Sequence, residues 1–343
     1  MSITNSEIFL SFKQSMDSYE KDQKSDHWKK NYKKKLGLFN EKYLTNFRNN
    51  NFSDGLDVKL YDVNHQRQLL KSLIEECGEE FVKNNLCKQN IGNLKSTENF
   101  KGKFLDNNQF YSIKWLNLLI DKIKIENQNI ICEIGGGYGC FAEKLIKYYN
   151  CKYILIDLPE ANILSTYYLS KHFPDKKIFI YNKNMKFVDS NLINEFDIII
   201  VPPWVKLDGV KIDLFINTRS FMEMNFDVIK SYFNLIEKNL KLNGYFFNNN
   251  RYLKDTVGYP ILFYKYPYDK KWKVEYSKKS WFENHCHTLI TKRISTDGDI
   301  YSEIENIKVI TNLHTYKFDK YLIKRLLPSS IFNLLIKIKN KFF

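Results

Sequence analysis

The stretch Ile131 to Phe141, ICEIGGGYGCF, decides the fold, because its four glycines fall within five consecutive positions. An apolar run containing Glu133 precedes the glycines, and a helical pattern begins near Phe141. A strand, a glycine turn and a helix in this order bring backbone N–H groups and the positive end of a helix to one place. Since glycine lets a ligand approach the backbone closely, the loop is predicted to receive a polar or anionic group of a cofactor.

The spacing of the glycines narrows the choice of cofactor. A dinucleotide-binding loop needs a third glycine where this chain has Cys140, and a phosphate-binding loop needs a Lys-Ser/Thr pair that is not present. What remains is an E-x-G-x-G-x-G pattern formed by Glu133, Gly135, Gly137 and Gly139. An acid at the start of this pattern would repel a diphosphate but would suit a ligand that carries an ammonium and a sulfonium group.

Outward from the loop, helical and β-rich runs alternate, which is typical of a parallel sheet covered by helices. Strands are predicted over 129–134, 152–157, KIFIYN, FDIIIVPPW, KIDLFINT and YFFNNN, with late strands in SWFENHCHTLITKRI. Helices are predicted over CFAEKLIKYY, EANILSTYYLSKHF and a long segment from Met224 that ends at Gly244. Residues 1 to about 107 show helical spacing and predict a mostly helical N-terminal region.

These motifs resemble the class I S-adenosylmethionine-dependent methyltransferases. The resemblance implies a Rossmann-like α/β fold with a mostly parallel sheet and an antiparallel late strand. In that family the glycine loop passes under the methionine part of the cofactor, and an acid that closes the second strand binds the ribose hydroxyls. Asp157, at the end of KYILID, matches that acid. The cofactor-binding residues expected from the resemblance are Glu133, Gly135, Gly137, Tyr138, Gly139, Asp157, Leu158 and Asn217.

A narrower resemblance is to bacterial sugar O-methyltransferases that serve surface-polysaccharide loci. It rests on EIGGGYGCFAEKL, ILIDLPEANILSTYYL, DLFINTRSFMEM and YFFNNNR, and on Trp28 and the Asn46-Phe47-Arg48 element of the N-terminal region. It implies methylation of a sugar hydroxyl in a capsular or lipopolysaccharide-type glycan or in its nucleotide-linked precursor. The expected domains are a helical region over 1–107, a methyltransferase domain over 108–294 and a C-terminal extension over 295–343.

Two other functions compete with this interpretation. VPPW, at the end of FDIIIVPPW, resembles the motif with which DNA amino-methyltransferases hold a target base, but Val201 stands where an Asn or Asp must accept the amino hydrogens. We therefore interpret Pro202 to Trp204 as a strand-end turn, and nucleic acid is not the favoured partner. Methylation of another small molecule and an inactive docking module that keeps the fold remain open.

Candidate catalytic and substrate-binding residues should follow the carboxyl ends of the strands, where open α/β sheets bind ligands. Removing a proton from a sugar hydroxyl requires a general base or a metal, and the candidates for this role are Glu223, His285 and His287. His285 and His287 would share one face of a strand and could form a metal pair, so a divalent metal is left open. The predicted substrate-binding residues are Arg219, Ser220, Asn249, Asn250 and Arg251, and the arginines suit an anionic acceptor group.

The composition sets the remaining expectations. Lys and Arg number 53 against 39 Asp and Glu, a net charge of +14, which permits attraction to nucleic acid, anionic lipid or an acidic glycan without choosing among them. The six cysteines form no CxxC pair, which argues against a zinc site. The N-terminal residues have no signal-peptide pattern, so we expect a cytoplasmic protein. Lys317 to Phe343 are apolar and basic, and are predicted either to touch a membrane surface peripherally or to pack on the domain; the oligomeric state is left open.

Overall fold

The computed structural model describes residues 3–18, 39–48, 63–94, 99–255, 257–281, 283–316 and 331, and its centre is an eight-stranded sheet. In spatial order the strands are β5 (Ile178–Ile180), β7 (Ile198–Val201), β4 (Lys152–Ile156), β3 (Ile130–Ile134), β9 (Ile212–Thr218), β10 (Leu240–Arg251), β14 (Cys286–Arg293) and β13 (Trp272–Lys279). The first six strands are parallel to one another, and β14 is antiparallel to both β10 and β13. The predicted Rossmann-like sheet, mostly parallel with an antiparallel late strand, is confirmed.

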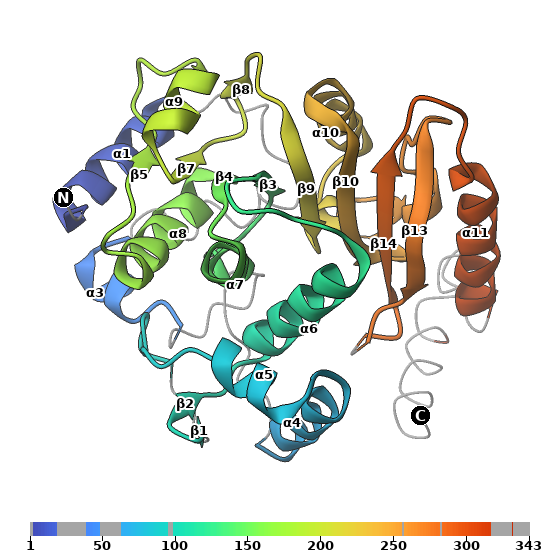
Figure 1. Ribbon diagram of the computed structural model, residues 1–343, viewed down its shortest axis with the longest axis horizontal. Coiled ribbons are helices and arrows are strands. Elements are labelled where there is room, and N and C mark those ends of the chain that lie inside the picture. Colours follow the sequence, from blue (N-terminus) through green and yellow to red (C-terminus); the bar gives the residue numbers. More distant parts are fainter. Residues whose placement is uncertain are drawn as a thin grey trace.

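Helices cover both faces of the sheet (Figure 1). One face carries α6 (Asn107–Lys122), α7 (Cys140–Tyr149) and α8 (Pro159–His172), and the other carries α9 (Ser190–Glu195), α10 (Phe226–Asn239) and α11 (Ile300–Tyr316). Successive strand residues point to opposite faces, so Ile131 belongs to the core under α7 whereas Cys132 belongs to the core under α10. The buried, β-branched strands are therefore nearly continuous apolar runs, as expected of a sheet covered on both sides.

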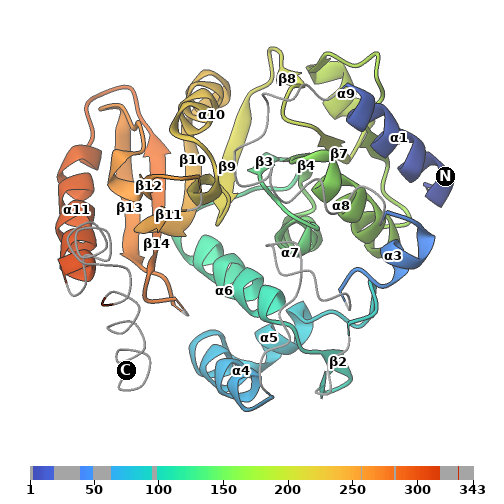
Figure 2. The ribbon, with the colours of Figure 1, turned by 180° about the vertical axis from the view of Figure 1, so that it is seen from behind.

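The described part of the N-terminal region is mostly helical, as predicted. It contains α1 (Asn5–Asp17), α3 (Glu41–Thr45), α4 (Val63–Cys77), α5 (Glu79–Asn85) and a hairpin of β1 (Asn99–Phe100) and β2 (Lys103–Phe104). Helix α1 packs against α8 near the β5 edge, while α4 and α5 lie against α6, as Figure 2 shows from behind. Ile8 of α1 and Leu44 of α3 belong to the same apolar core as β3 and α7. Leu73 of α4 and Val82 of α5 form a smaller, separate cluster with α6. The boundary after residue 107 stays a prediction.

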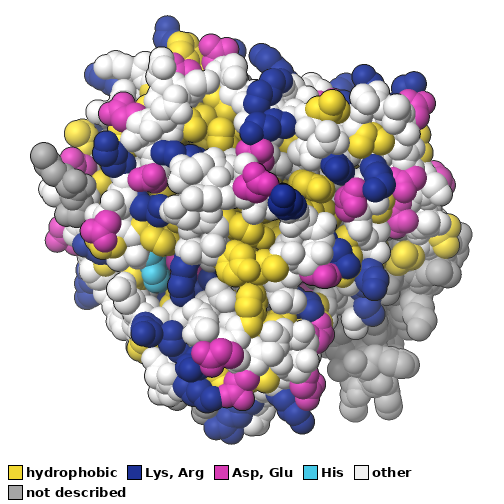
Figure 3. Space-filling view, viewed as in Figure 1, with side chains coloured by type: hydrophobic (Ala, Val, Ile, Leu, Met, Phe, Trp, Pro, Cys, Tyr) yellow, Lys and Arg dark blue, Asp and Glu magenta, His cyan; other side chains and the backbone are white. Residues whose placement is uncertain are grey.

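Short elements line the ends of the sheet. They are β6 (Phe187–Val188) paired with β8 (Lys206–Leu207), β11 (Leu253–Asp255) paired with β12 (Pro260–Leu262), and the 3-10 turns η2 (Phe221–Glu223) and η3 (Phe263–Lys265). Lysine and arginine side chains are spread among acidic ones over the face shown in Figure 3, so no single basic patch dominates that face. No described helix has both the length and the apolarity needed to cross a membrane.

The structure corrects one detail of the sequence-based prediction and adds two that were not predicted. Helix α10 ends at Asn239 and not at Gly244, because Leu240 takes an extended conformation, is buried and pairs with Ile212 at the start of β10. Strand β13 was not among the predicted strands, and it lies at the edge of the sheet, paired with β14. Strand β7 lies between β4 and β5, although β5 precedes it in the chain. Trp28 and the tail after Tyr316, Ile331 apart, lie outside the described residues.

Candidate functional site

The carboxyl ends of four parallel strands place the predicted site residues at one edge of the sheet. The glycine loop follows β3, Asp157 follows β4, and the segment from Arg219 to Glu223 follows β9. Arg251 is the last residue of β10, and His285 immediately precedes the adjoining strand β14. The topology therefore brings the ends of segments far apart in the sequence to the same edge, as the sequence predicted.

The glycine loop combines one crowded position with one open position. Gly135 has a φ of +76°, and a Cβ there would lie 2.1 Å from the Ser220 hydroxyl oxygen, so the loop can approach the turn after β9 only without a side chain. Gly137 has a φ of +59°, yet nothing lies within 4 Å of the place where its Cβ would be. The space at Gly137 is thus kept clear of the protein's own atoms, which fits a loop that receives a ligand.

Asp157 lies beside this open position. Its carboxylate accepts hydrogen bonds from the N–H groups of Gly137 at 2.8 Å and of Leu158 at 2.7 Å. Burial raises the pKa of Asp157 to about 7, partly offset by these two donors, and the charges of Glu160 and Glu223 raise it further. A positive charge near the three carboxylates would favour ionisation of Asp157, so the site suits a ligand with a cationic centre.

Glu133 supports the loop from within the sheet. It is fully buried in β3, and the Tyr153 hydroxyl on β4 donates to it at 2.7 Å. Burial raises the pKa of Glu133 to about 7, against the lowering effect of that hydrogen bond. A Cβ at Gly136 would lie 2.7 Å from a Glu133 carboxylate oxygen, so the carboxylate touches the loop backbone. Glu133 therefore lies directly beneath the glycines.

Asn217 and Ser220 tie the loop to β9. The buried Asn217 amide donates to the Ile134 carbonyl at 2.9 Å and to the Ser220 hydroxyl, which itself donates to the same carbonyl at 3.2 Å. The Asn217 carbonyl oxygen accepts from the N–H of Phe221 and from the Asn250 amide. These bonds position the residue immediately before Gly135, and so the start of the loop.

Asn248, Asn249 and Asn250 near the end of β10 lie inside the strand and are completely buried. Asn250 donates to Asn248 at 2.6 Å on the face toward α10. Asn249, on the opposite face, donates to Ser280 at 3.2 Å and to Thr288 at 2.6 Å, while its carbonyl oxygen has no hydrogen-bond partner among the described residues. The predicted polar run is therefore a network of side-chain hydrogen bonds within the sheet.

Tyr138 connects the loop to the N-terminal region. Its ring packs against Phe47 and Tyr168, and its hydroxyl donates to Asp106 at 2.9 Å. Asp106 also forms a 2.6 Å ion pair with Arg48, and neither of these two side chains is exposed. Because the Tyr138 side chain is occupied in this way, its contribution to a ligand would come from its backbone.

Two of the candidate bases lie at the site edge in different environments. The Glu223 carboxylate forms an ion pair with Lys254. The His285 side chain is 52% exposed, and its Nε2 lies 3.8 Å from Glu283. Burial, followed by the positive charge of Arg251, lowers the pKa of His285, so the imidazole is neutral near pH 7 and able to accept a proton.

His287 lies apart from His285. It is buried in β14, where its Nδ1 bonds the Tyr252 hydroxyl at 3.0 Å and its Nε2 bonds the Ser277 hydroxyl at 2.7 Å. Burial lowers its pKa to about 3. The expected shared face is not formed, because β14 begins only at Cys286 and His285 turns outward before it. The two histidines therefore do not form a metal pair.

Arg219 is held rigidly at the end of β9. Its φ of +61° is uncommon for a residue with a side chain, and its N–H donates to the Asn249 carbonyl at 2.7 Å. Its guanidinium lies 5.3 Å from the centre of the Tyr111 ring and 3.4 Å from a Glu283 oxygen. Arg219 is thus fixed at the site edge by an aromatic ring and a carboxylate together.

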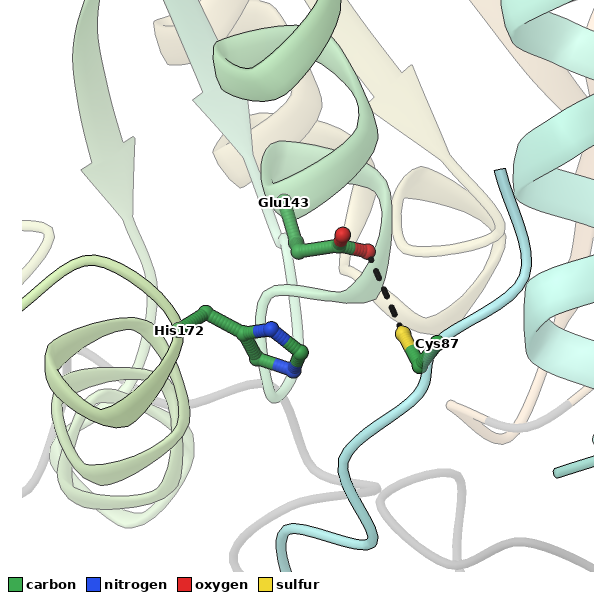
Figure 4. A group of neighbouring side chains, drawn as sticks. All are labelled: Cys87, Glu143 and His172. Atoms are coloured by element: carbon green, nitrogen blue, oxygen red, sulfur yellow. Dashed lines mark hydrogen bonds between the residues drawn. The ribbon is translucent and has the colours of Figure 1, made fainter. Parts of the chain in front are cut away.

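One cluster of side chains has the ligand types of a metal site. Cys87, Glu143 and His172 converge from the segment after α5, from α7 and from α8, as Figure 4 shows. The buried Lys144 ammonium pairs with Glu143 and donates to the Cys87 sulfur at 3.1 Å. Burial opposes the charge of Lys144, but Cys87 and Glu143 raise its pKa above the ordinary value. A permanent ammonium therefore occupies the place of a cation, and the cluster does not fit a divalent metal.

Several residues of the site were missed by sequence reasoning. Asp106 precedes the helix sequence NNQF and had a recognisable N-cap signal, but nothing indicated its ion pair. Glu283 was available as an acid two positions before His285. The role of Tyr153 could not be foreseen, because it depends on which strand lies beside β3.

Among known proteins, this chain matches only solved structures. No family model and no curated protein matches the chain. The pyocyanin biosynthetic protein PhzM is 8% identical over 51% of this chain and 53% of its own, with a TM-score of 0.33. An O-methyltransferase family 2 protein from Planctomyces limnophilus, solved with apigenin, is 10% identical over 55% and 58%, with a TM-score of 0.37. An RNA methyltransferase from Salinibacter ruber, solved with S-adenosyl-L-homocysteine, is 5% identical over 53% and 92%, with a TM-score of 0.34.

The match to the first two of these solved structures spans little more than half of their length. The three proteins differ in their named ligands and activities, and they define no activity for this chain.

Proposed function

We propose that this protein is an S-adenosylmethionine-dependent methyltransferase that methylates a sugar hydroxyl during surface-polysaccharide biosynthesis. The observation that carries the proposal is the open space at Gly137 beside the Asp157 carboxylate. The negative charge of Glu160 near Asp157 suits a cationic ligand, which agrees with a sulfonium and an ammonium. The sugar acceptor rests on the sequence resemblance of the motifs around Glu133, Asp157 and Asn217.

The residues present fit this cofactor. When bound, S-adenosylmethionine would supply a methyl group activated by its positively charged sulfur. The backbone of Gly135, Gly137 and Gly139 would lie against its methionine part, with Tyr138 and Asn217 positioning the loop. The Asp157 carboxylate, next to Leu158, would accept hydrogen bonds from the ribose hydroxyls.

We assign the general base to His285. A sugar hydroxyl is a poor acid, so a base must take its proton as the new bond to oxygen forms. The His285 imidazole is neutral near pH 7 and half exposed, whereas Glu223 is paired with Lys254 and His287 is buried. In this mechanism the hydroxyl proton moves to an imidazole nitrogen, and the Glu283 carboxylate at 3.8 Å stabilises the imidazolium that forms.

The cofactor proposal is tested by placing a methyl group in the open space. Gly137→Ala should weaken binding of S-adenosylhomocysteine, measured by titration calorimetry, by more than tenfold, because the added Cβ occupies the ligand's place. Gly209→Ala is the matched control: Gly209 also has a positive φ, +64°, and open space at its Cβ, but lies in the loop before β9 at the opposite edge of the sheet. Equal binding by the two variants would contradict the assignment of the loop.

The acceptor is tested in the source organism. Mass spectrometry of surface glycans from a strain that lacks this protein should show the loss of one methyl group from one sugar, and Asp157→Asn protein should not restore it. An unchanged methylation pattern would contradict the proposal that the acceptor is a sugar. The proposal about the cofactor would still be tested separately by calorimetry.

A further inference from the structure

We propose that the acceptor carries an oxyanion, a phosphate or a carboxylate, and that Arg251 binds it with Arg219 and His285 alongside. This inference rests on the proposed function and names the class of its substrate. Arg251 ends β10 and Arg219 follows β9, so the backbones of these two neighbouring strands fix both side chains at the edge that also holds the glycine loop.

Arg251 differs from three other described arginines in its partners. Each of those three forms an ion pair with a carboxylate: Arg48 with Asp106, Arg219 with Glu283, and Arg293 with Asp269. Arg251 has no carboxylate within ion-pair distance among the described residues, and its Nε is buried without a hydrogen-bond partner there. A guanidinium is always charged and presents a planar set of donors that matches an oxyanion. A partly buried guanidinium without a counter-ion is thus a built-in place for an anionic ligand group.

The surroundings of Arg251 are cationic. The charges of Arg251, Arg219 and Lys254 all act on His285 and lower its pKa, after burial itself, while Glu283 alone raises it. Lys254 forms an ion pair with Glu223, and Arg219 forms one with Glu283. The two carboxylates are thus engaged by two of the cations, and Arg251 supplies a positive charge in excess. An anionic acceptor would neutralise this charge, whereas a neutral sugar would leave it unpaired.

The same cationic surroundings disfavour a divalent metal at this position. Glu283, His285 and Cys286 place their ligand atoms within 4.8 Å of one another. Burial raises the pKa of Cys286, so that it stays a thiol, and both Arg219 and Arg251 bring positive charge to this thiol. A metal ion would meet repulsion from these arginines.

The rigid support of Arg219 argues that the subsite is formed before a ligand arrives. Its backbone bond to Asn249 and its position over the Tyr111 ring restrict its side chain. Strand pairing opposite Cys286 in the β10–β14 ladder fixes the backbone of Arg251. Little conformational entropy would be lost when the restrained Arg219 guanidinium binds an anion.

The test is titration calorimetry with pyrophosphate, glucuronate and glucose at fixed ionic strength, with and without S-adenosylhomocysteine. The wild-type protein should bind pyrophosphate or glucuronate and not glucose, and the preferred anion tells a phosphate source from a carboxylate source. Arg251→Gln should weaken that binding roughly tenfold or more, because charge-assisted hydrogen bonds are lost, with S-adenosylhomocysteine binding unchanged. Arg251→Lys keeps the charge but not the planar set of donors, so its affinity for the anion should lie between those of the wild type and Arg251→Gln.

Arg67→Gln on the exposed surface of α4 is the matched control, since it removes the same charge from a residue outside the strands that carry Arg251 and Arg219. The inference is overturned if neither anion binds, or if Arg251→Gln and Arg67→Gln bind the anion equally well. Anion binding that depends on Arg251 in a protein that does not bind S-adenosylhomocysteine would keep the anion subsite and remove the methyltransferase proposal.

Discussion

At the scale of single residues, Glu133 and Asp157 are two acids whose charge is controlled by the fold. Burial raises the pKa of each to about 7, although one lies beneath the glycine loop and the other beside it. Near neutral pH each acid therefore changes charge readily when a cation comes close. Binding of a cationic cofactor should release protons and become tighter as the pH rises through 7.

The same shifts predict how stability depends on pH. Between the ordinary values of 4.5 for Glu and 3.8 for Asp and the folded value of about 7, the folded state holds protons that the unfolded state has lost. The two acids therefore contribute most to the free energy of unfolding of the ligand-free protein below pH 4. This contribution is lost as the pH rises through 7. Urea denaturation at pH 5 and pH 8 should show that Glu133→Gln reduces this decline, and that Glu133→Gln with Asp157→Asn reduces it further.

Tyr153→Phe serves as the comparison for Glu133, since it removes only the hydrogen bond and leaves both acids in place. A decline with pH that is the same in the wild type and in the Glu133→Gln variant would show that Glu133 is ionised in the folded state.

At the scale of elements, the Arg48–Asp106–Tyr138 chain joins three segments: the residues after α3, the start of α6 and the glycine loop. Both members of the ion pair are fully buried, so each depends on the other for its charge. The N-terminal region is thereby connected to the loop by polar bonds as well as by the packing of Phe47 on Tyr138.

Asp106→Asn should lower the free energy of unfolding by about 3–5 kcal/mol, because it leaves the Arg48 charge buried without a counter-ion. Asp269→Asn is the matched control: this acid pairs with Arg293 but is 39% exposed, so its loss should cost about 1 kcal/mol or less. Denaturant titrations of the two variants give the comparison, and equal losses would contradict a structural role for the buried pair.

The elements around the glycine loop could be predicted from the sequence because local signals determine them. Helix α7 has the predicted bounds, since glycine precedes Cys140 and the apolar spacing continues to Tyr149. The edge of the sheet that carries the site could be predicted because the glycine loop and Asp157 each follow a strand, and parallel strands end at the same edge. The position of β7 and the existence of β13 could not be predicted, because both depend on pairing with distant strands and not on local sequence. For the same reason the hydrogen bond from Tyr153 to Glu133 and the burial of Asn249 and Asn250 within β10 could not be predicted.

At the scale of the whole molecule, α1 is an integral part of the core. Nearly every residue of α8 is buried, because α7 and the sheet cover one side of it and α1 covers another. A helix enclosed in this way needs no polar face. The N-terminal helix α1 thus covers α8, which begins at Pro159, two residues after Asp157.

Ile8→Ala should therefore destabilise the protein by about 2–5 kcal/mol, since Ile8 is 2% exposed and its loss leaves a cavity against α8. Leu10→Ala on the same helix is the control, because Leu10 is 57% exposed and its truncation should change the free energy of unfolding by less than about 0.5 kcal/mol. Thermal and denaturant unfolding measure both, and similar effects would mean that α1 is not docked.

The crossing of β5 over β7 has a consequence for the newly synthesised chain. Strand β5 is made before β7, but its neighbour in the finished sheet is β7, through Ile178–Ile180 opposite Ile198–Ile200. The β5 segment can take its final place only after residue 201 has left the ribosome and β7 has paired with β4. An earlier part of the chain therefore depends on a later one to complete this edge of the sheet.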